Sequence, residues 1–177
     1  HEASVRNNAA KKAAFLAGQD YLSHKWEKYL YRSFSYFIIG WNMRNPVLAD
    51  RQVRLALTHC VDRPRIINEV CFGLAGELSG NFVPHSPYYD QSIKPWPFDI
   101  EKAKSILEAA GWRDTDGDGI LDKELNGKRT PLEFTFMMVQ NHPYQSKWVP
   151  IVQQDMQKAG VKMNVKQAEW SVYSEQM

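Results

Sequence analysis

The stretch RDTDGDGILD, residues 113–122, contains four aspartates and two glycines between a helix-like and a strand-like run. Spaced carboxylates suit Ca²⁺, and an EF-hand loop adds a bidentate glutamate at its twelfth position. Counted from Asp114, that position is Leu125, so the loop is not an EF-hand. Two interpretations remain open, a structural calcium site and a turn in which aspartates accept hydrogen bonds from backbone amides. The calcium ligands would be Asp114, Asp116, Asp118 and Asp122.

The histidines and cysteines do not form a recognisable catalytic or zinc-binding set. His59 adjoins Cys60, but neighbours on a helix diverge by about 100°, and a nucleophile needs a base within reach and a third orienting group. HExxH, GxSxG, GxGxxG and the P-loop motif are absent. We therefore expect no enzyme activity, no catalytic metal and no cofactor. Cys60 and Cys71 each lie on the apolar face of an expected helix, which favours buried thiols, although a disulfide stays open.

The overall composition is that of one globular domain, or one domain with an appendage. The chain has 177 residues, of which 44% are hydrophobic and 24% charged, with a net charge of +2. That charge is too small to indicate binding to nucleic acid or to an anionic membrane. The N-terminal HEASVRNNAAKK lacks the apolar core of a secretory signal, and no apolar run approaches the roughly 18 residues of a membrane span. Export remains open, and we expect the chain to be a piece of a longer protein.

Hydrophobic periodicity predicts the elements that position these residues. The apolar run SFSYFIIGWN is typical of a buried strand, and Asp50, Asp62 and Asp99 are each followed by an amphipathic helical pattern that they can cap. The long segment 73–98 has no periodicity and predicts a loop, and Asn126-Gly127 is a hairpin signal. We expect helices over 8–17, 100–110 and 146–159, and strands over 33–42, 132–139 and 161–167.

The last three of these elements predict a βαβ unit with parallel strands and a right-handed crossover. Ligands of open α/β sheets bind beyond the carboxyl ends of parallel strands, which indicates the connector 140–146. We expect Ser146 to cap the helix, whose N-terminus would favour an anion nearby. An ordinary polar connector is the alternative for any single residue. The connector offers donors, an acceptor and an aromatic ring from Gln140, Asn141, His142 and Tyr144.

Three long stretches follow one another in a characteristic order. They are YFIIGWNMRNPVLADRQVRLALTHCVDRPRIINEVCFGLAG, then NFVPHSPYYDQSIKPWPFDIEKAKSILEAAGWRDTDGDGILDK, and finally GVKMNVKQAEWSVYSEQM. Together they resemble extracellular solute-binding proteins of ABC importers, specifically the oligopeptide and dipeptide binding family, known as family 5. The resemblance runs from about residue 33 to the end and is looser over residues 1–32.

The resemblance implies an α/β fold in which two lobes of the periplasmic-binding-protein type surround a cleft. Residues 33–177 would be part of one solute-binding lobe, with a mixed sheet, a βαβ unit and flanking helices, and residues 1–32 an N-terminal helical segment at a lobe or hinge boundary. The implied function is non-enzymatic: the protein captures peptides or similar solutes and delivers them to an ABC permease in the membrane. We expect a monomer that does not bind nucleic acid, located in the periplasm or outside the cell and membrane-associated in its full-length form.

The resemblance also implies that QNHPY lies in the cleft, in agreement with the strand-end argument. Some dipeptide-binding members carry an arginine in this loop, whereas here Asn141 and His142 stand instead, so strict dipeptide specificity is not expected. Longer peptides, a sugar or a nickel chelate remain open. The family carries DxDGDG loops outside its cleft, which favours a turn at residues 113–122. The rival hypothesis is a calcium-stabilised interaction module.

Overall fold

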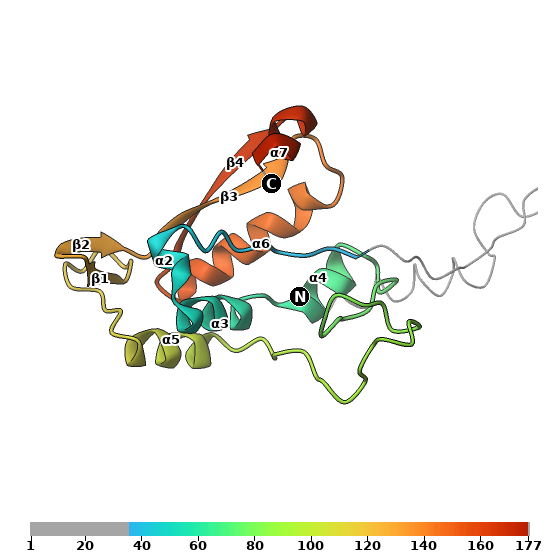
Figure 1. Ribbon diagram of the computed structural model, residues 1–177, viewed down its shortest axis with the longest axis horizontal. Coiled ribbons are helices and arrows are strands. Elements are labelled where there is room, and N and C mark those ends of the chain that lie inside the picture. Colours follow the sequence, from blue (N-terminus) through green and yellow to red (C-terminus); the bar gives the residue numbers. More distant parts are fainter. Residues whose placement is uncertain (1–35, 177) are drawn as a thin grey trace, which may run out of the picture. The chain divides into compact units, whose positions relative to one another are not determined.

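The structure is a computed structural model that describes residues 36–176 (Figure 1). The helix expected over 8–17 and the segment 1–32 lie outside the described residues. The chain divides into two compact units. In the described part, the first unit comprises residues 36–39 and 63–95, and the second comprises residues 40–62 and 96–176.

The second unit contains the predicted βαβ unit. Strand β3 (Glu133–Val139) is followed by helix α6 (Gln145–Lys158) and strand β4 (Lys162–Ala168). The two strands pair in parallel over their full length, from Glu133 opposite Lys162 to Val139 opposite Ala168, and α6 packs against β4 (Figure 1). The prediction of co-directional strands is confirmed. Side chains that alternate along the strands enter the core together with the inner face of α6: Phe134, Met138, Met163, Val149, Val152 and Met156.

Helices pack beside this unit through the faces that the sequence predicts. Helix α3 (Arg51–His59) contacts α5 (Ile100–Ala109), and both are capped as expected. The Asp50 carboxylate accepts a hydrogen bond from the Gln52 amide at 2.8 Å, and the Asp99 carboxylate accepts one from the Lys102 amide at 2.8 Å. A short helix α2 (Pro46–Ala49), which the periodicity did not predict, precedes α3. The shared interior contains Val53, Ala56, Leu57, Ala103 and Leu107.

A β-hairpin connects α5 to the βαβ unit. Strand β1 (Asp122–Leu125) pairs antiparallel with β2 (Lys128–Pro131). Asn126 and Gly127 form the turn with φ values of 52° and 73°, the positive φ that a two-residue hairpin turn requires. The hairpin predicted from Asn-Gly is therefore confirmed.

The strand predicted over 33–42 is wrong where the structure describes it. Residues 36–42 belong to no helix or strand and are part of neither described sheet. Phe37 and Ile38 are 61% and 65% exposed. Apolar composition indicated a buried strand, but a strand also needs a neighbouring strand as its hydrogen-bond partner, and composition does not specify that partner. Trp41 does contact the sheet, with its ring 5.8 Å from that of Phe134 in an edge-to-face arrangement.

The first unit contains helix α4 (Arg63–Glu69) and most of the predicted long loop. Residues 73–98 include neither helix nor strand, as expected. Short-range contacts order this loop, among them a hydrogen bond of 3.2 Å from the Ser79 hydroxyl to the Tyr89 hydroxyl. Cys60 is buried and Cys71 half-buried, and both thiols are free. Among residues 36–176, no helix combines the length and apolar character needed to cross a membrane.

Candidate functional site

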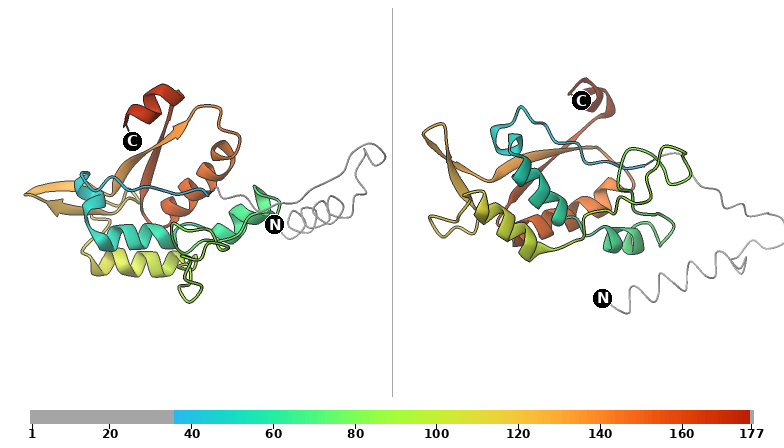
Figure 2. Two further views of the ribbon diagram at one scale, coloured as in Figure 1. Left: turned by 45° about the vertical axis from the view of Figure 1, so that its right-hand side comes forward. Right: turned by 60° about the horizontal axis from the view of Figure 1, so that its bottom comes forward.

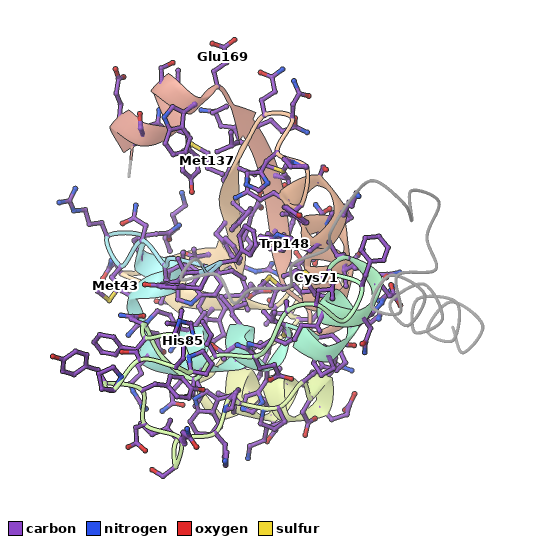
Figure 3. All side chains as sticks on the ribbon, turned by 90° about the vertical axis from the view of Figure 1, so that its right-hand side faces the viewer. Met43, Cys71, His85, Met137, Trp148 and Glu169 are labelled. Atoms are coloured by element: carbon purple, nitrogen blue, oxygen red, sulfur yellow. The ribbon has the colours of Figure 1, made fainter. Side chains whose placement is uncertain are left out.

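The connector between β3 and α6 lies beside the carboxyl end of β4. Val139 pairs with Ala168, and the Gln140 amide donates a hydrogen bond of 2.8 Å to the Ala168 carbonyl. This contact brings the connector next to Glu169, at the turn from β4 into α7 (Trp170–Gln176) (Figures 2 and 3). The four predicted residues therefore gather at the end of the sheet where the strand-end rule expects a ligand.

Asn141 turns the chain away from β3. Its φ is 57°, in the left-handed region that asparagine adopts more readily than most residues. The turn lets the His142 amide donate to the Val139 carbonyl at 3.3 Å. As a result, the Asn141 side chain is exposed at the outer edge of the connector.

His142 caps helix α6, a role that the sequence did not suggest. Its Nδ1 atom accepts hydrogen bonds from the Tyr144 amide at 3.3 Å and from the Gln145 amide at 3.2 Å. A nitrogen that accepts carries no proton, so the neutral ring is protonated on Nε2. The expected cap at Ser146 is wrong, because the helix begins at Gln145 and Ser146 is its second residue. Pro150 consequently lies in the second turn rather than the first.

Gln145 closes the connector from the other side. Its side-chain carbonyl accepts a hydrogen bond of 2.9 Å from the Val139 amide, so the first residue of α6 is tied to the last residue of β3. The rings of His142 and Tyr144 lie 6.3 Å apart in a tilted arrangement. The connector is thus held at both ends, with Gln140, Asn141 and Tyr144 exposed and His142 half-buried.

Two further residues at this end of the sheet were not in the predicted set. Glu169 is exposed directly after β4, and Trp170 is 68% exposed and stacks on Tyr173 with ring centroids 6.0 Å apart. The strand-end rule would have found them if it had been applied to the second strand as well as to the first. A shallow surface concavity lies elsewhere in the second unit and contains none of the predicted residues; Asn45, Val47, Leu125, Lys128 and Glu133 line part of it.

The aspartate loop adopts the turn that the sequence left as one alternative. The Asp114 carboxylate accepts hydrogen bonds from the amides of Gly117 at 2.7 Å and Gly119 at 3.0 Å, and Asp118 accepts one from the Ile120 amide at 2.8 Å. Carboxylate oxygens of Asp114, Asp116 and Asp122 lie within 4.8 Å of one another, while Asp118 is not part of that group. The Arg129 hydrogen bond, followed by bonds from Thr115, lowers the pKa of Asp122 to about 2.

The sequence matches a family profile over residues 2–177, that of the bacterial extracellular solute-binding proteins, family 5 middle. The chain belongs to this family. It is 37% identical over 150 residues to the oligopeptide-binding protein AppA of Bacillus subtilis, covering 82% of this chain and 26% of AppA. It is 30% identical over 125 residues to the nickel-binding periplasmic protein of Escherichia coli, covering 70% of this chain and 23% of that protein.

Solved structures agree with this membership. AppA from Bacillus subtilis in complex with a nonapeptide gives a TM-score of 0.69 at 36% identity, covering 77% of this chain and 27% of that chain. NikA from Brucella suis in complex with Fe(III)-EDTA gives a TM-score of 0.66 at 28% identity, covering 77% and 27%. The chain spans about a quarter of the length of these relatives. The expected fold class, a mixed α/β part of a periplasmic-binding-protein fold, is confirmed, and the family is one of binding proteins rather than enzymes.

Proposed function

We propose that this chain is part of one lobe of an ABC importer's solute-binding protein, which captures peptides or similar solutes outside the cytoplasm and delivers them to a membrane permease. The observation that carries the proposal is the exposed polar connector at the adjoining carboxyl ends of β3 and β4. Residues 33–177 form part of the lobe, and residues 1–32 stand at its boundary. The full-length protein is a membrane-associated monomer in the periplasm or at the cell surface.

The groups on the connector suit an extended peptide. Gln140 and Asn141 carry side-chain amides that both donate and accept hydrogen bonds, and His142 contributes an imidazole ring to the same connector. An extended backbone alternates donors with acceptors, so such groups bind it whatever its side chains are. The Tyr144 ring offers an apolar face, and Glu169 offers a carboxylate to a cationic group of the solute.

A peptide is the solute class that we propose. The name and structure of AppA refer to oligopeptides and a nonapeptide, and other relatives are named for nickel and glutathione. The connector carries no arginine to pair a ligand carboxylate at a fixed distance. Recognition through neutral hydrogen-bonding groups tolerates variation in peptide length better than recognition of a charged end.

Capture works by closure of two lobes around the solute. The solute binds the closed arrangement more tightly than the open one and so shifts a hinge equilibrium toward closure. The permease recognises the closed form, and the energy for transport comes from separate ATPase subunits. The chain alone would bind solute weakly, because contacts that bridge the two lobes are needed for full affinity.

The experiment is native purification of the full-length protein, followed by mass spectrometry of the small molecules released on denaturation. A family of co-purified peptides supports the proposal. A co-purified saccharide or metal chelate overturns the peptide assignment while preserving the transport role. If nothing co-purifies, calorimetric titration with a mixed peptide pool replaces the measurement, and no heat from the pool refutes peptide binding.

A further inference from the structure

Arg129 reaches from strand β2 into the aspartate loop and touches two of its carboxylates. Its Nη2 atom lies 2.7 Å from Asp116 Oδ2 and 2.7 Å from Asp122 Oδ2. Asp122 is only 7% exposed and accepts further hydrogen bonds from Thr115, from the amide at 3.1 Å and from the hydroxyl at 2.8 and 2.9 Å. One guanidinium thus bridges an exposed carboxylate and a buried one.

The remaining aspartates of the loop are satisfied by backbone amides. Asp114 binds the amides of Gly117 and Gly119, and Asp118 binds the amide of Ile120. Three carboxylates within 4.8 Å of one another repel unless a cation lies among them. Among the described residues, Arg129 is the cationic side chain with ion pairs to this group.

We propose that Arg129 is the resident cation of the aspartate loop, and that its guanidinium takes the place of a divalent ion and makes the fold of residues 113–122 independent of calcium. The guanidinium suits this role because it is planar, always charged and able to bind two carboxylates at once. The hairpin fixes its position, since Arg129 pairs with Glu124 in a register set by the Asn126-Gly127 turn.

The loop matters for the βαβ unit because its last residues lie against the joint between α6 and β4. The Leu121 amide donates to the Gly160 carbonyl at 2.8 Å, and the Leu132 amide donates to the Leu121 carbonyl at 2.6 Å. Closure of the loop by Arg129 therefore positions Leu121 at the point where the chain passes from α6 into β4. Arg129 is a positioning residue in this sense, since its ion pairs join Asp116 and Asp122.

The test compares amide hydrogen exchange of Gly117, Gly119 and Ile120 in the wild-type chain and in Arg129→Gln, with and without millimolar CaCl₂. We expect exchange about tenfold faster in Arg129→Gln, because loss of the bridging charge opens the loop. Calcium should leave the wild type unchanged and restore protection in the variant, where the three carboxylates then lack their cation. Arg113→Gln is the matched control, since Arg113 pairs with Glu108 at 3.1 Å and not with the loop carboxylates.

Three results would overturn the proposal. The first is an increase in amide protection of the wild type on addition of calcium, which would show that an ion and not the guanidinium closes the loop. The second is an exchange rate in Arg129→Gln equal to that of the wild type or of Arg113→Gln. The third is a failure of calcium to protect Arg129→Gln, which would show that Arg129 does not replace a divalent ion. If Arg129→Gln does not fold, Arg129→Lys, which keeps the charge without the planar fork, supplies the comparison, with intermediate protection expected.

Discussion

Replacement of Gly160 by alanine tests the packing of Leu121 against the joint between α6 and β4. Gly160 follows α6 with a φ of 78°, and a Cβ atom there would lie 2.7 Å from Leu121 Cγ and 3.2 Å from Leu121 Cδ2. Carbon atoms do not approach to 2.7 Å without displacement. The close approach arises because the Gly160 carbonyl accepts the Leu121 amide at 2.8 Å, which holds the two chain segments together.

Two terms make up the expected loss of stability. A left-handed backbone costs an alanine about 1–2 kcal/mol relative to glycine. Forcing a methyl group into a packed contact costs about 1–3 kcal/mol more. We therefore expect Gly160→Ala to lower the free energy of unfolding by about 2–5 kcal/mol in urea titrations followed by circular dichroism.

Gly127→Ala is the matched control. Gly127 has a similar φ of 73°, but a Cβ there meets nothing within 4 Å, so only the backbone term applies. The difference in lost unfolding free energy between the two variants therefore measures the contact with Leu121. Shortening Leu121 in the double variant Gly160→Ala/Leu121→Ala should recover part of that difference. Equal losses for Gly160→Ala and Gly127→Ala would refute the packing of Leu121 against the α6–β4 joint.

Three other predictions follow from single residues. The pKa of Asp122 is about 2 in the folded protein against an ordinary 3.8, so its contribution to stability is full above about pH 4 and is lost as the pH falls toward 2. In a plot of the urea midpoint against pH, Asp122→Asn should reduce the fall in the midpoint below about pH 4. A fall equal to that of the wild type would contradict this. Burial, followed by the charge of Asp155, raises the pKa of Cys60 to about 12, so at pH 8 a thiol reagent should modify half-buried Cys71 first and Cys60 only after unfolding. Modification of native Cys60 at the rate of Cys71 would refute its burial. His142→Ala should cost about 1 kcal/mol through loss of the α6 cap, whereas His142→Asn should retain most of it, and equal stability of both variants would exclude the cap.

The elements that the sequence predicted correctly are those whose signals lie within a short stretch of the chain. Asp50 and Asp99 cap helices because a carboxylate followed by an amphipathic run needs no distant partner. The Asn126-Gly127 turn sets its hairpin in the same way. The parallel pairing of β3 with β4 was also predictable, because a helix between two strands leaves parallel pairing as the natural connection.

Features that depend on a distant or unusual partner were not predictable. The apolar composition of residues 36–42 could not reveal that this run joins neither of the described sheets. His142 can cap α6 because the chain turns at Asn141, whose φ is left-handed. Hydrophobic periodicity does not predict such a turn. The sequence did not predict that Arg129 pairs with the aspartate loop. The register of the hairpin, and not the spacing in the sequence, brings Arg129 to Asp116 and Asp122.

The most direct test of the proposed site is the affinity of the full-length protein for its co-purified peptide, measured by calorimetry in Asn141→Gly and Asn126→Gly. Both asparagines have a left-handed φ, 57° and 52°, so glycine removes the side chain at each position without strain on the backbone. Asn141 lies on the β3–α6 connector, and Asn126 lies at the hairpin turn. We expect Asn141→Gly to weaken binding by about tenfold, as loss of a hydrogen-bonding partner does, and Asn126→Gly to bind as the wild type. Wild-type affinity in Asn141→Gly, together with wild-type affinity in Tyr144→Ala, would place the solute elsewhere.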